Sequence, residues 1–157
     1  MKKLLAILLI VITIFLCSCS KESDFGIEQF VDRMNKNYET NLETNKFSSS
    51  QRDGDNFLFY SDNSSMMSFM LDNQNNIRSI SLLITADYSI EKAKDTFCKM
   101  CSIFTGKNFE SQTKEIRESD LYNNIKFADG NNKITVGRYK YSVICNNYSI
   151  TFFCEKI

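Results

Sequence analysis

Hydrophobic residues in this chain change from helical spacing to strand spacing, and the change occurs twice. Residues 25–38 carry apolar side chains at helical intervals, and residues 90–104 do so again. Short apolar runs separated by turn residues follow each of these segments. The clearest run, Ile77 to Thr85, alternates apolar and polar residues, which is typical of a strand in a sheet with one buried face. The pattern predicts an α+β domain built on an antiparallel sheet.

The expected strands divide into two sets of four, one set behind each helix. Between the second helix and its strands, residues 105–120 are polar, and we expect no more than a short helix near residues 114–118. Asn146-Asn147 is expected to form the turn of a two-residue hairpin. The strands are expected at residues 41–49, 57–61, 66–71 and 77–85, and then at 125–127, 133–136, 139–145 and 148–154.

The two helices begin with similar sequences. Asp24-Phe25-Gly26-Ile27-Glu28 corresponds to Asp87-Tyr88-Ser89-Ile90-Glu91, and Leu42 to Phe47 is similar to Leu121 to Phe127. We interpret this as an internal duplication with repeat units 25–86 and 87–157, the alternative being a chance similarity between two amphipathic helix starts.

Neither repeat unit could bury its apolar sheet face alone, so we expect both helices on the same face of one shared sheet. This arrangement resembles the tandem helix-plus-four-strand architecture of the β-lactamase inhibitory protein family. The resemblance concerns the order of elements, and no sequence motif accompanies it.

The amino terminus has the composition of a secretory signal peptide over residues 1–18. Lys2 and Lys3 precede an apolar segment of about 13 residues, which is shorter than the ~18–20 residues that a membrane-spanning helix needs. Leu16-Cys17-Ser18-Cys19 then resembles the lipobox of bacterial lipoproteins. That resemblance implies that Cys19 becomes the mature amino terminus and carries a diacylglycerol group, which anchors the protein to the outer side of the cell membrane.

Residues 19–24 form a short linker between this anchor and a single domain at residues 25–157. The five residues between Cys19 and the domain, 20–24, span at most about 17 Å when extended, so the domain is expected to lie close to the membrane. Anchoring through two acyl chains is stable where one chain binds only marginally.

The composition argues against several classes of function. The chain has no histidine, which is the commonest general base and metal ligand, and we expect no catalytic residues, no metal site and no cofactor. Without the leader lysines the mature chain carries two more acidic than basic residues, and it has no basic block. Nucleic acid is therefore not an expected partner, and neither is electrostatic attachment to anionic lipid.

Four cysteines lie beyond the lipobox: Cys98, Cys101, Cys145 and Cys154. An even number of cysteines outside the cytoplasm is compatible with disulfides. Strand parity places Cys145 and Cys154 on the same inward face, about 20 Å apart along the hairpin, so they cannot bond to each other. The geometry allows a disulfide between either strand cysteine and a helix cysteine, which is Cys101 in the apolar stripe or Cys98 at its edge. Four buried, reduced thiols are the alternative.

Cys98 and Cys101 also form a C-x-x-C motif. Redox enzymes place this motif at the start of a helix, where the dipole lowers the pKa of the first thiol, whereas here it falls two turns inside one. An extracytoplasmic thiol-disulfide protein that uses these two residues is our alternative hypothesis for function.

The sheet face opposite the predicted core carries fewer charges than a solvated face normally does. Serine and threonine alternate there with Met66, Met70, Leu83, Ile134 or Thr135, Ile144 and Phe153. Ordinary apolar exposure would explain such a face, and so would a binding surface. We therefore favour a lipid-anchored, non-catalytic binding or interaction module whose partner is an unknown protein or small-molecule ligand.

Overall fold

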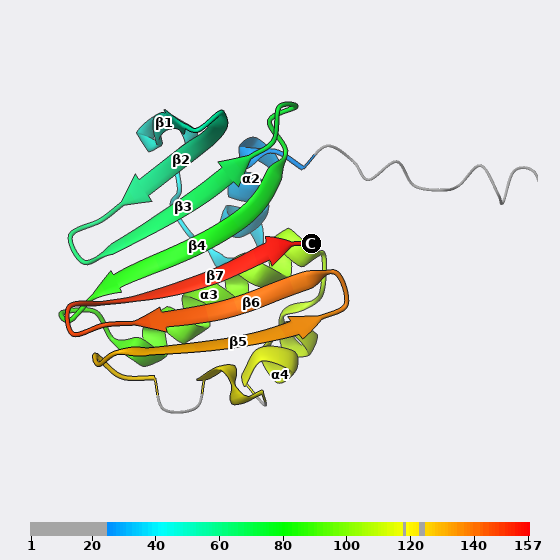
Figure 1. Cartoon of the computed structure of the whole chain (residues 1–157). Helices are drawn as coiled ribbons and strands as arrows, with labels where there is room; N and C mark the ends of the chain where they lie inside the picture. The colour runs from blue at the N-terminus through cyan, green and yellow to red at the C-terminus, as the bar shows by residue number, and fades with distance from the viewer. Residues whose placement is uncertain (1–24, 118, 123–124) are drawn as a thin grey trace, which may run out of the picture.

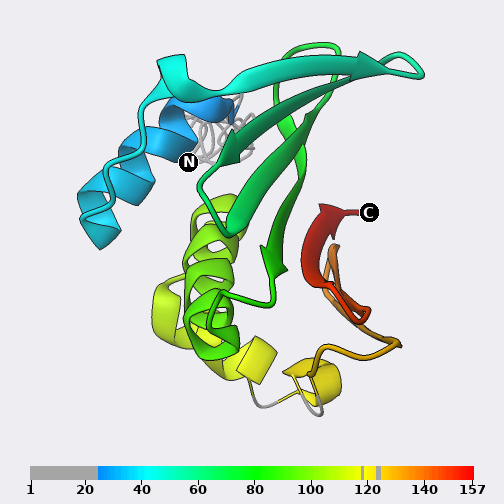
Figure 2. The same ribbon diagram turned by 90° about the vertical axis from the view of Figure 1, so that its left-hand side faces the viewer.

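The fold is a single antiparallel sheet covered on one side by helices (Figure 1). The structure is a computed structural model that describes residues 25–117, 119–122 and 125–157. The predicted signal peptide, the lipidation site Cys19 and the linker 19–24 lie outside the described residues. Within the described part, three α-helices lie on one side of seven strands, as the turned view in Figure 2 makes clear. The prediction of an α+β fold is confirmed.

Two short 3-10 helices complete the described elements. In chain order these elements are α2 (Ile27–Tyr38), η1 (Thr44–Lys46), β1 (Ser48–Arg52), β2 (Asp55–Ser61), β3 (Ser65–Leu71), β4 (Ile77–Thr85), α3 (Ile90–Thr105), α4 (Phe109–Arg117), η2 (Asp120–Tyr122), β5 (Gly130–Val136), β6 (Tyr139–Cys145) and β7 (Ser149–Lys156).

The long helix α3 has a defined cap at each end. The Ser89 hydroxyl accepts a hydrogen bond from the backbone N–H of Lys92 at 3.4 Å, which satisfies one of the unpaired donors at the helix start. At the other end Gly106 has a φ of 72°, the left-handed conformation in which glycine commonly ends helices.

The strand order is β1-β2-β3-β4-β7-β6-β5, so β4 and β7 pair at the centre of the sheet. These two strands bury their inward side chains most completely, because the helices cover the middle of the sheet. Phe97 of α3 packs on Phe152 of β7, with ring centroids 5.4 Å apart, and Phe30 of α2 packs on Phe69 of β3 at 4.9 Å. The core therefore lies between one face of the sheet and the helices.

The segment that follows α3 contains more helix than the sequence predicts. Helix α4 occupies Phe109–Arg117, a longer stretch than the expected one near residues 114–118, and it buries Gln112 and Ile116 completely. The expected strand at 125–127 does not form. The 3-10 helix η2 instead buries Leu121 and Tyr122 beside the edge strand β5.

The expected strand at 41–49 is also replaced, by η1 and a later β1. Asn35 of α2 explains the change because its side-chain amide binds the backbone of Leu42 twice. Its Oδ1 accepts from the Leu42 N–H at 2.9 Å, and its Nδ2 donates to the Leu42 carbonyl at 2.8 Å. The Asn35 amide thus supplies the backbone hydrogen bonds that a neighbouring strand would otherwise make, and it holds Leu42 beside the end of α2.

The β6–β7 hairpin turns one residue later than predicted. Cys145 pairs with Ile150, so Asn147 and Tyr148 occupy the turn. The Asn146 Oδ1 accepts from the N–H groups of Tyr148 and Ser149, both at 2.8 Å, which makes Asn146 the first residue of the turn. Cys145 and Cys154 still face the same side of the sheet. Cys154 pairs with Tyr141, four residues before Cys145 on β6, so the two cysteines are about 13 Å apart along the strands rather than about 20 Å.

Candidate functional sites

The outward face of the sheet carries most of the apolar residues that the sequence assigns to it. Strand pairing places Met66 opposite Leu83. The chain neighbours of Leu83, Leu82 and Ile84, point the other way and are fully buried against the helices. Thr135, rather than Ile134, belongs to this face, because Ile134 pairs with the fully buried Tyr141.

The central row of this face consists of hydroxyl and aromatic side chains. The hydroxyl oxygens of Ser68 and Ser81 are 2.5 Å apart across β3 and β4. Ser81 is paired on its other side with Phe153, which in turn is paired with Ser142. Ser81 is buried although it points away from the helices, so neighbouring side chains cover it.

Two aromatic residues extend this face onto β2, and the sequence analysis did not identify them. Phe57 pairs with Met70 and Phe59 with Ser68, which places both phenylalanines on the outward parity. Their rings are nearly parallel, 15° apart, with centroids 6.3 Å from each other. Their spacing of two residues indicates a shared face, but only the pairing with β3 shows which face it is.

We define the outer sheet surface as these outward residues of β2, β3, β4, β6 and β7. Ionic groups lie at its margin, where Lys140 and Glu155 form a salt bridge of 2.5 Å. Such a surface can exclude water and exchange hydrogen bonds with a partner. The outer sheet surface comprises Phe57, Phe59, Met66, Ser68, Met70, Ser81, Leu83, Ser142, Ile144, Thr151 and Phe153.

A second group of chemically distinctive residues is a buried thiol cluster between α3 and β7. Cys98, Cys101 and Cys154 have no exposed surface, and no disulfide joins them. Cys101 and Cys154 are neighbours, close enough for Cys154 to affect the pKa of the Cys101 thiol. The Cys98 Sγ lies 3.6 Å from the Tyr122 hydroxyl.

The local environment raises the pKa of both α3 thiols, Cys98 and Cys101. Burial raises the pKa of Cys98, and burial together with the neighbouring Cys154 raises that of Cys101 further. A nucleophilic thiol needs the opposite shift, so this environment favours structural thiols over the alternative redox hypothesis.

The structure corrects the prediction that Cys98 lies at the edge of the apolar stripe. Cys98 is fully buried because α4 and η2 cover that flank of α3, with Tyr122 placed directly against it. Cys145 is inward-facing as predicted, but it is only half-buried at the end of β6 and lies along the strand from the cluster.

Among the described residues, no group of three or more histidine, cysteine, aspartate or glutamate side chains is arranged to hold a metal ion. None of the helices in this part of the chain is both long enough and apolar enough to span a bilayer. Comparisons with protein-family models, with curated proteins and with solved structures find no match.

Proposed function

We propose that the mature protein is a lipid-anchored, non-catalytic module that binds a protein partner through the outer sheet surface. The observation that carries the proposal is the composition of that surface. Its aromatic, methionine and hydroxyl side chains are the groups expected where a partner displaces water, while the ion pair stays at the margin.

The dimensions of the surface favour a protein over a small molecule. The five strands of the outer sheet surface, spaced about 4.8 Å apart, are roughly 19 Å wide, and six or seven residues along each strand add about 20 Å, so the surface covers about 400 Å². A standard protein interface buries about 800 Å² on each partner. Small ligands instead occupy concave sites that surround most of their surface.

Membrane attachment is supported by the sequence motif that ends at Cys19. The described chain begins close to that residue, and it is fixed there because the Phe25 carbonyl accepts a hydrogen bond of 2.9 Å from the Ile77 N–H at the start of β4. A diacylglycerol group at Cys19 would therefore hold the domain within one short linker of the bilayer surface.

We further propose that the domain arose by duplication of a unit with one helix followed by strands. The strand order supports this, because the last strands of the two units, β4 and β7, are neighbours and the preceding strands follow outward in the same sequence on each side. The second unit has three described strands where the first has four, and α4 and η2 occupy the remaining length.

The partner can be captured by site-specific photocrosslinking on intact cells. A photoreactive phenylalanine at Ile144, which is 43% exposed on the outer sheet surface, is expected to yield a covalent adduct with a specific protein, identified by mass spectrometry. The matched control carries the same group at the exposed Lys36 on α2. Adducts in equal yield from both positions, or none from Ile144, would contradict the proposal.

Lipidation is tested separately by metabolic labelling with an alkyne fatty acid. The wild-type protein is expected to incorporate the label, and the Cys19→Ala variant is not. Equal labelling of the two proteins would refute the anchor without affecting the crosslinking result.

A further inference from the structure

Strand β1 forms one border of the sheet, and it is exposed along its whole length. Within the described part of the chain, β1 pairs with β2 alone. Each of its residues, Ser48–Arg52, is exposed, and Figure 2 shows the tip of the β1–β2 hairpin lying away from the helix layer. Edge strands that avoid association usually carry lysine, proline or a bulge. β1 has none of these, and its one charge, Arg52, is at its end.

The opposite border of the sheet is protected. The 3-10 helix η2 lies against the edge strand β5, and the Asn132 side chain of β5 donates a hydrogen bond of 3.4 Å to the Leu121 carbonyl of η2. A covered edge does not readily pair with another chain. β1 is therefore the border at which the sheet can be extended.

The hydrogen-bond pattern of the neighbouring strands shows which backbone groups of β1 face this border. The Asp62 N–H donates to the Ser65 carbonyl at 2.9 Å, so from this pair onward every second residue of β2 bonds to β3. The residues of β2 between them bond to every second residue of β1, starting at Ser48. The backbone N–H and C=O groups of Ser49 and Gln51 therefore point outward from the border, away from β2.

These four backbone groups are complementary to the same groups of a second copy. With two β1 strands antiparallel and Ser50 opposite Ser50, each Ser49 faces a Gln51 and every group is paired. A register centred on Ser49 requires the Phe47 N–H, which already donates to a carbonyl of η1 at 3.3 Å. A register centred on Gln51 requires Asp53, which lies in the turn with a φ of 53°. The register centred on Ser50 is thus the one that pairs all four groups.

We propose that two copies of this chain pair through β1, about a two-fold axis at Ser50, and form one continuous sheet. Such a contact uses the same surface on both copies, as most homodimers do. The side chains are compatible with it, because Arg52 lies opposite Ser48 and no like charges of β1 are directly opposed. The small serine side chains at the centre allow the two strands to approach closely.

The pairing enlarges the proposed binding surface. Ser50 pairs with Phe57 of β2 and Ser48 with Phe59, so the outward side of β1 continues the outer sheet surface. Antiparallel neighbours in one sheet keep the same face outward, and the outer sheet surfaces of the two copies therefore lie side by side. One copy supplies about 400 Å², whereas a standard interface buries about 800 Å² on each partner. Two copies together supply that area.

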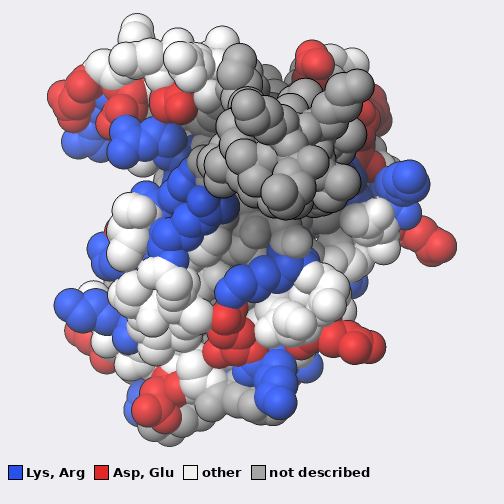
Figure 3. Space-filling model, turned by 90° about the vertical axis from the view of Figure 1, so that its right-hand side faces the viewer, with Lys and Arg blue, Asp and Glu red and all other residues white. Residues whose placement is uncertain are grey.

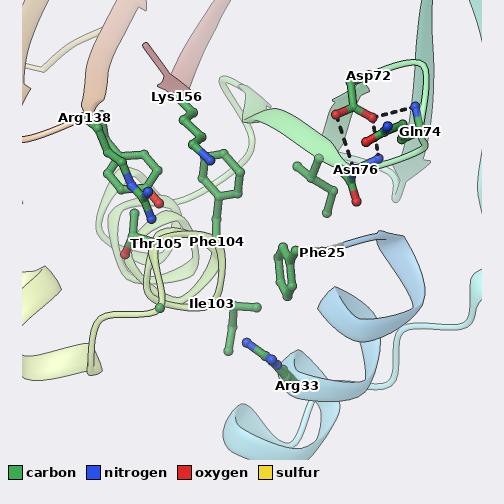
Figure 4. A pocket seen from close by; sticks show the side chains of 13 residues that line it. Phe25, Arg33, Asp72, Gln74, Asn76, Ile103, Phe104, Thr105, Arg138 and Lys156 are labelled. Atoms are coloured by element: carbon green, nitrogen blue, oxygen red, sulfur yellow. Dashed lines mark hydrogen bonds between the residues drawn. The ribbon is translucent and has the colours of Figure 1, made fainter. Parts of the chain in front are cut away.

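The symmetry also fits two copies anchored in one membrane, a step that rests on the proposed anchor at Cys19. The two-fold axis is perpendicular to the sheet, and two anchored copies require it to lie along the membrane normal. The described chain begins on the helix side, where the ring centroids of Phe25 and Phe30 are 6.3 Å apart. Figure 4 shows Phe25 beside the start of α2 and near Ile103 of α3. The helices of both copies then face the bilayer, and the joined outer sheet surfaces face away from it.

A common membrane compensates for the short length of β1. A strand of this length forms few contacts, but confining two copies to one surface raises their effective concentration. Basic and acidic side chains are interspersed over the end of the molecule at which the described chain begins (Figure 3). Two copies therefore approach each other there without a strong field of one sign between them.

Cysteine crosslinking of the full-length protein in neutral detergent tests the register. Ser50→Cys places two thiols on facing residues whose Cα atoms are about 4.5 Å apart, within the range of a disulfide. Dissolved oxygen, with copper phenanthroline as catalyst, accepts the electrons as the disulfide forms. Ser48→Cys is the matched control, because Ser48 is also exposed on the outward face but its two copies lie about 13 Å apart along the strands. We expect about tenfold more disulfide-linked dimer from Ser50→Cys than from this control, because disulfide geometry is strict.

Charge substitutions at the axis test the association without a new thiol. Ser50→Lys places two like charges directly opposite each other, so co-purification of two differently tagged copies should fall about tenfold. Pairing Ser50→Lys with Ser50→Glu places opposite charges there and should restore it. Ser50 is exposed, so neither change should shift the urea midpoint of unfolding.

Equal dimer yields from the two cysteine variants, or co-purification that Ser50→Lys leaves unchanged, would overturn the inference. So would crosslinking of Ser50→Cys on intact cells to a different protein in place of a second copy. The outer sheet surface and the anchor are tested separately, by photocrosslinking at Ile144 and by labelling at Cys19. Those experiments can fail while the copies still pair in detergent, and the pairing can fail while they succeed.

Discussion

Because Cys101 and Cys154 are neighbours, stability measurements can distinguish the reduced and the disulfide-bonded states of the thiol cluster. Both residues are fully buried, one in α3 and the other in β7, so each links the helix layer to the sheet. With the thiols reduced, Cys101→Ala or Cys154→Ala removes a buried sulfur and leaves a small cavity, which should lower the free energy of unfolding by about 1–2 kcal/mol. The two losses should be less than additive, because the variants empty the same space.

Oxidation would change these values in a characteristic way. A small disulfide such as oxidised glutathione can accept the two electrons that leave the thiols of Cys101 and Cys154 as their sulfurs bond. The new bond closes a loop of about 50 residues, and in the chain-entropy model it adds about 4 kcal/mol to the free energy of unfolding. Either single variant should then lose that whole increment, and the double variant should lose no further increment.

Urea unfolding before and after oxidation, each with and without reductant, measures these differences. Cys98→Ala is the matched control, since Cys98 is equally buried but its sulfur contacts the hydroxyl of Tyr122 instead of another thiol. Its loss should be the same in all conditions. A reductant-dependent loss for Cys98→Ala would show that the pairing is assigned to the wrong helix residue. Negligible losses of stability for all three variants would show that the face of α3 that carries Cys98 and Cys101 is not buried against the sheet.

Three further predictions concern single positions away from the thiols. Gln112→Leu should lower the free energy of unfolding by about 2–3 kcal/mol in urea melts, because the buried amide donates to the Tyr141 hydroxyl at 3.3 Å and accepts from Thr105 at 2.8 Å; an unchanged midpoint would contradict this. Gly106→Ala should cost about 1 kcal/mol by the same assay, through backbone strain at a φ of 72° and without a clash, since no atom lies within 4 Å of the added carbon. The hydrogen bond from the Asn76 N–H holds the pKa of Asp72 below its ordinary value. The ionised carboxylate therefore stabilises the fold above the unfolded-state pKa of about 3.9, and this stabilisation is lost as the pH falls through the lower folded-state pKa. Asp72→Ala should therefore lower the urea midpoint at pH 7 but hardly at pH 2, and an equal loss at both would refute the assignment.

The elements with one buried face were predictable from the sequence. The helices near residues 25–38 and 90–104 and the strand Ile77–Thr85 appear where the apolar spacing places them. Their signal is strong because each packs against the core along its whole length, so every inward position must be apolar. The outward parity of Met66, Leu83 and Phe153 followed from the same alternation.

Helix α4 was underestimated because a polar residue occupies the middle of its buried stripe. Phe109, Gln112 and Ile116 lie at helical spacing, but Gln112 interrupts the apolar pattern, and its burial depends on Tyr141 from a distant strand. The position of Cys98 was misjudged for the same reason, because the flank that covers it belongs to this segment. A pattern read along one element cannot include a hydrogen-bond partner that only the fold supplies.

The candidate sites depended on long-range pairing to an even greater degree. Phe57 and Phe59 became part of the outer sheet surface through the register of β2 on β3. The buried thiols of Cys101 and Cys154 come together in the same way, because α3 packs on β7. Neither arrangement has a local sequence signal, since in each the residues are neighbours only after the sheet has formed.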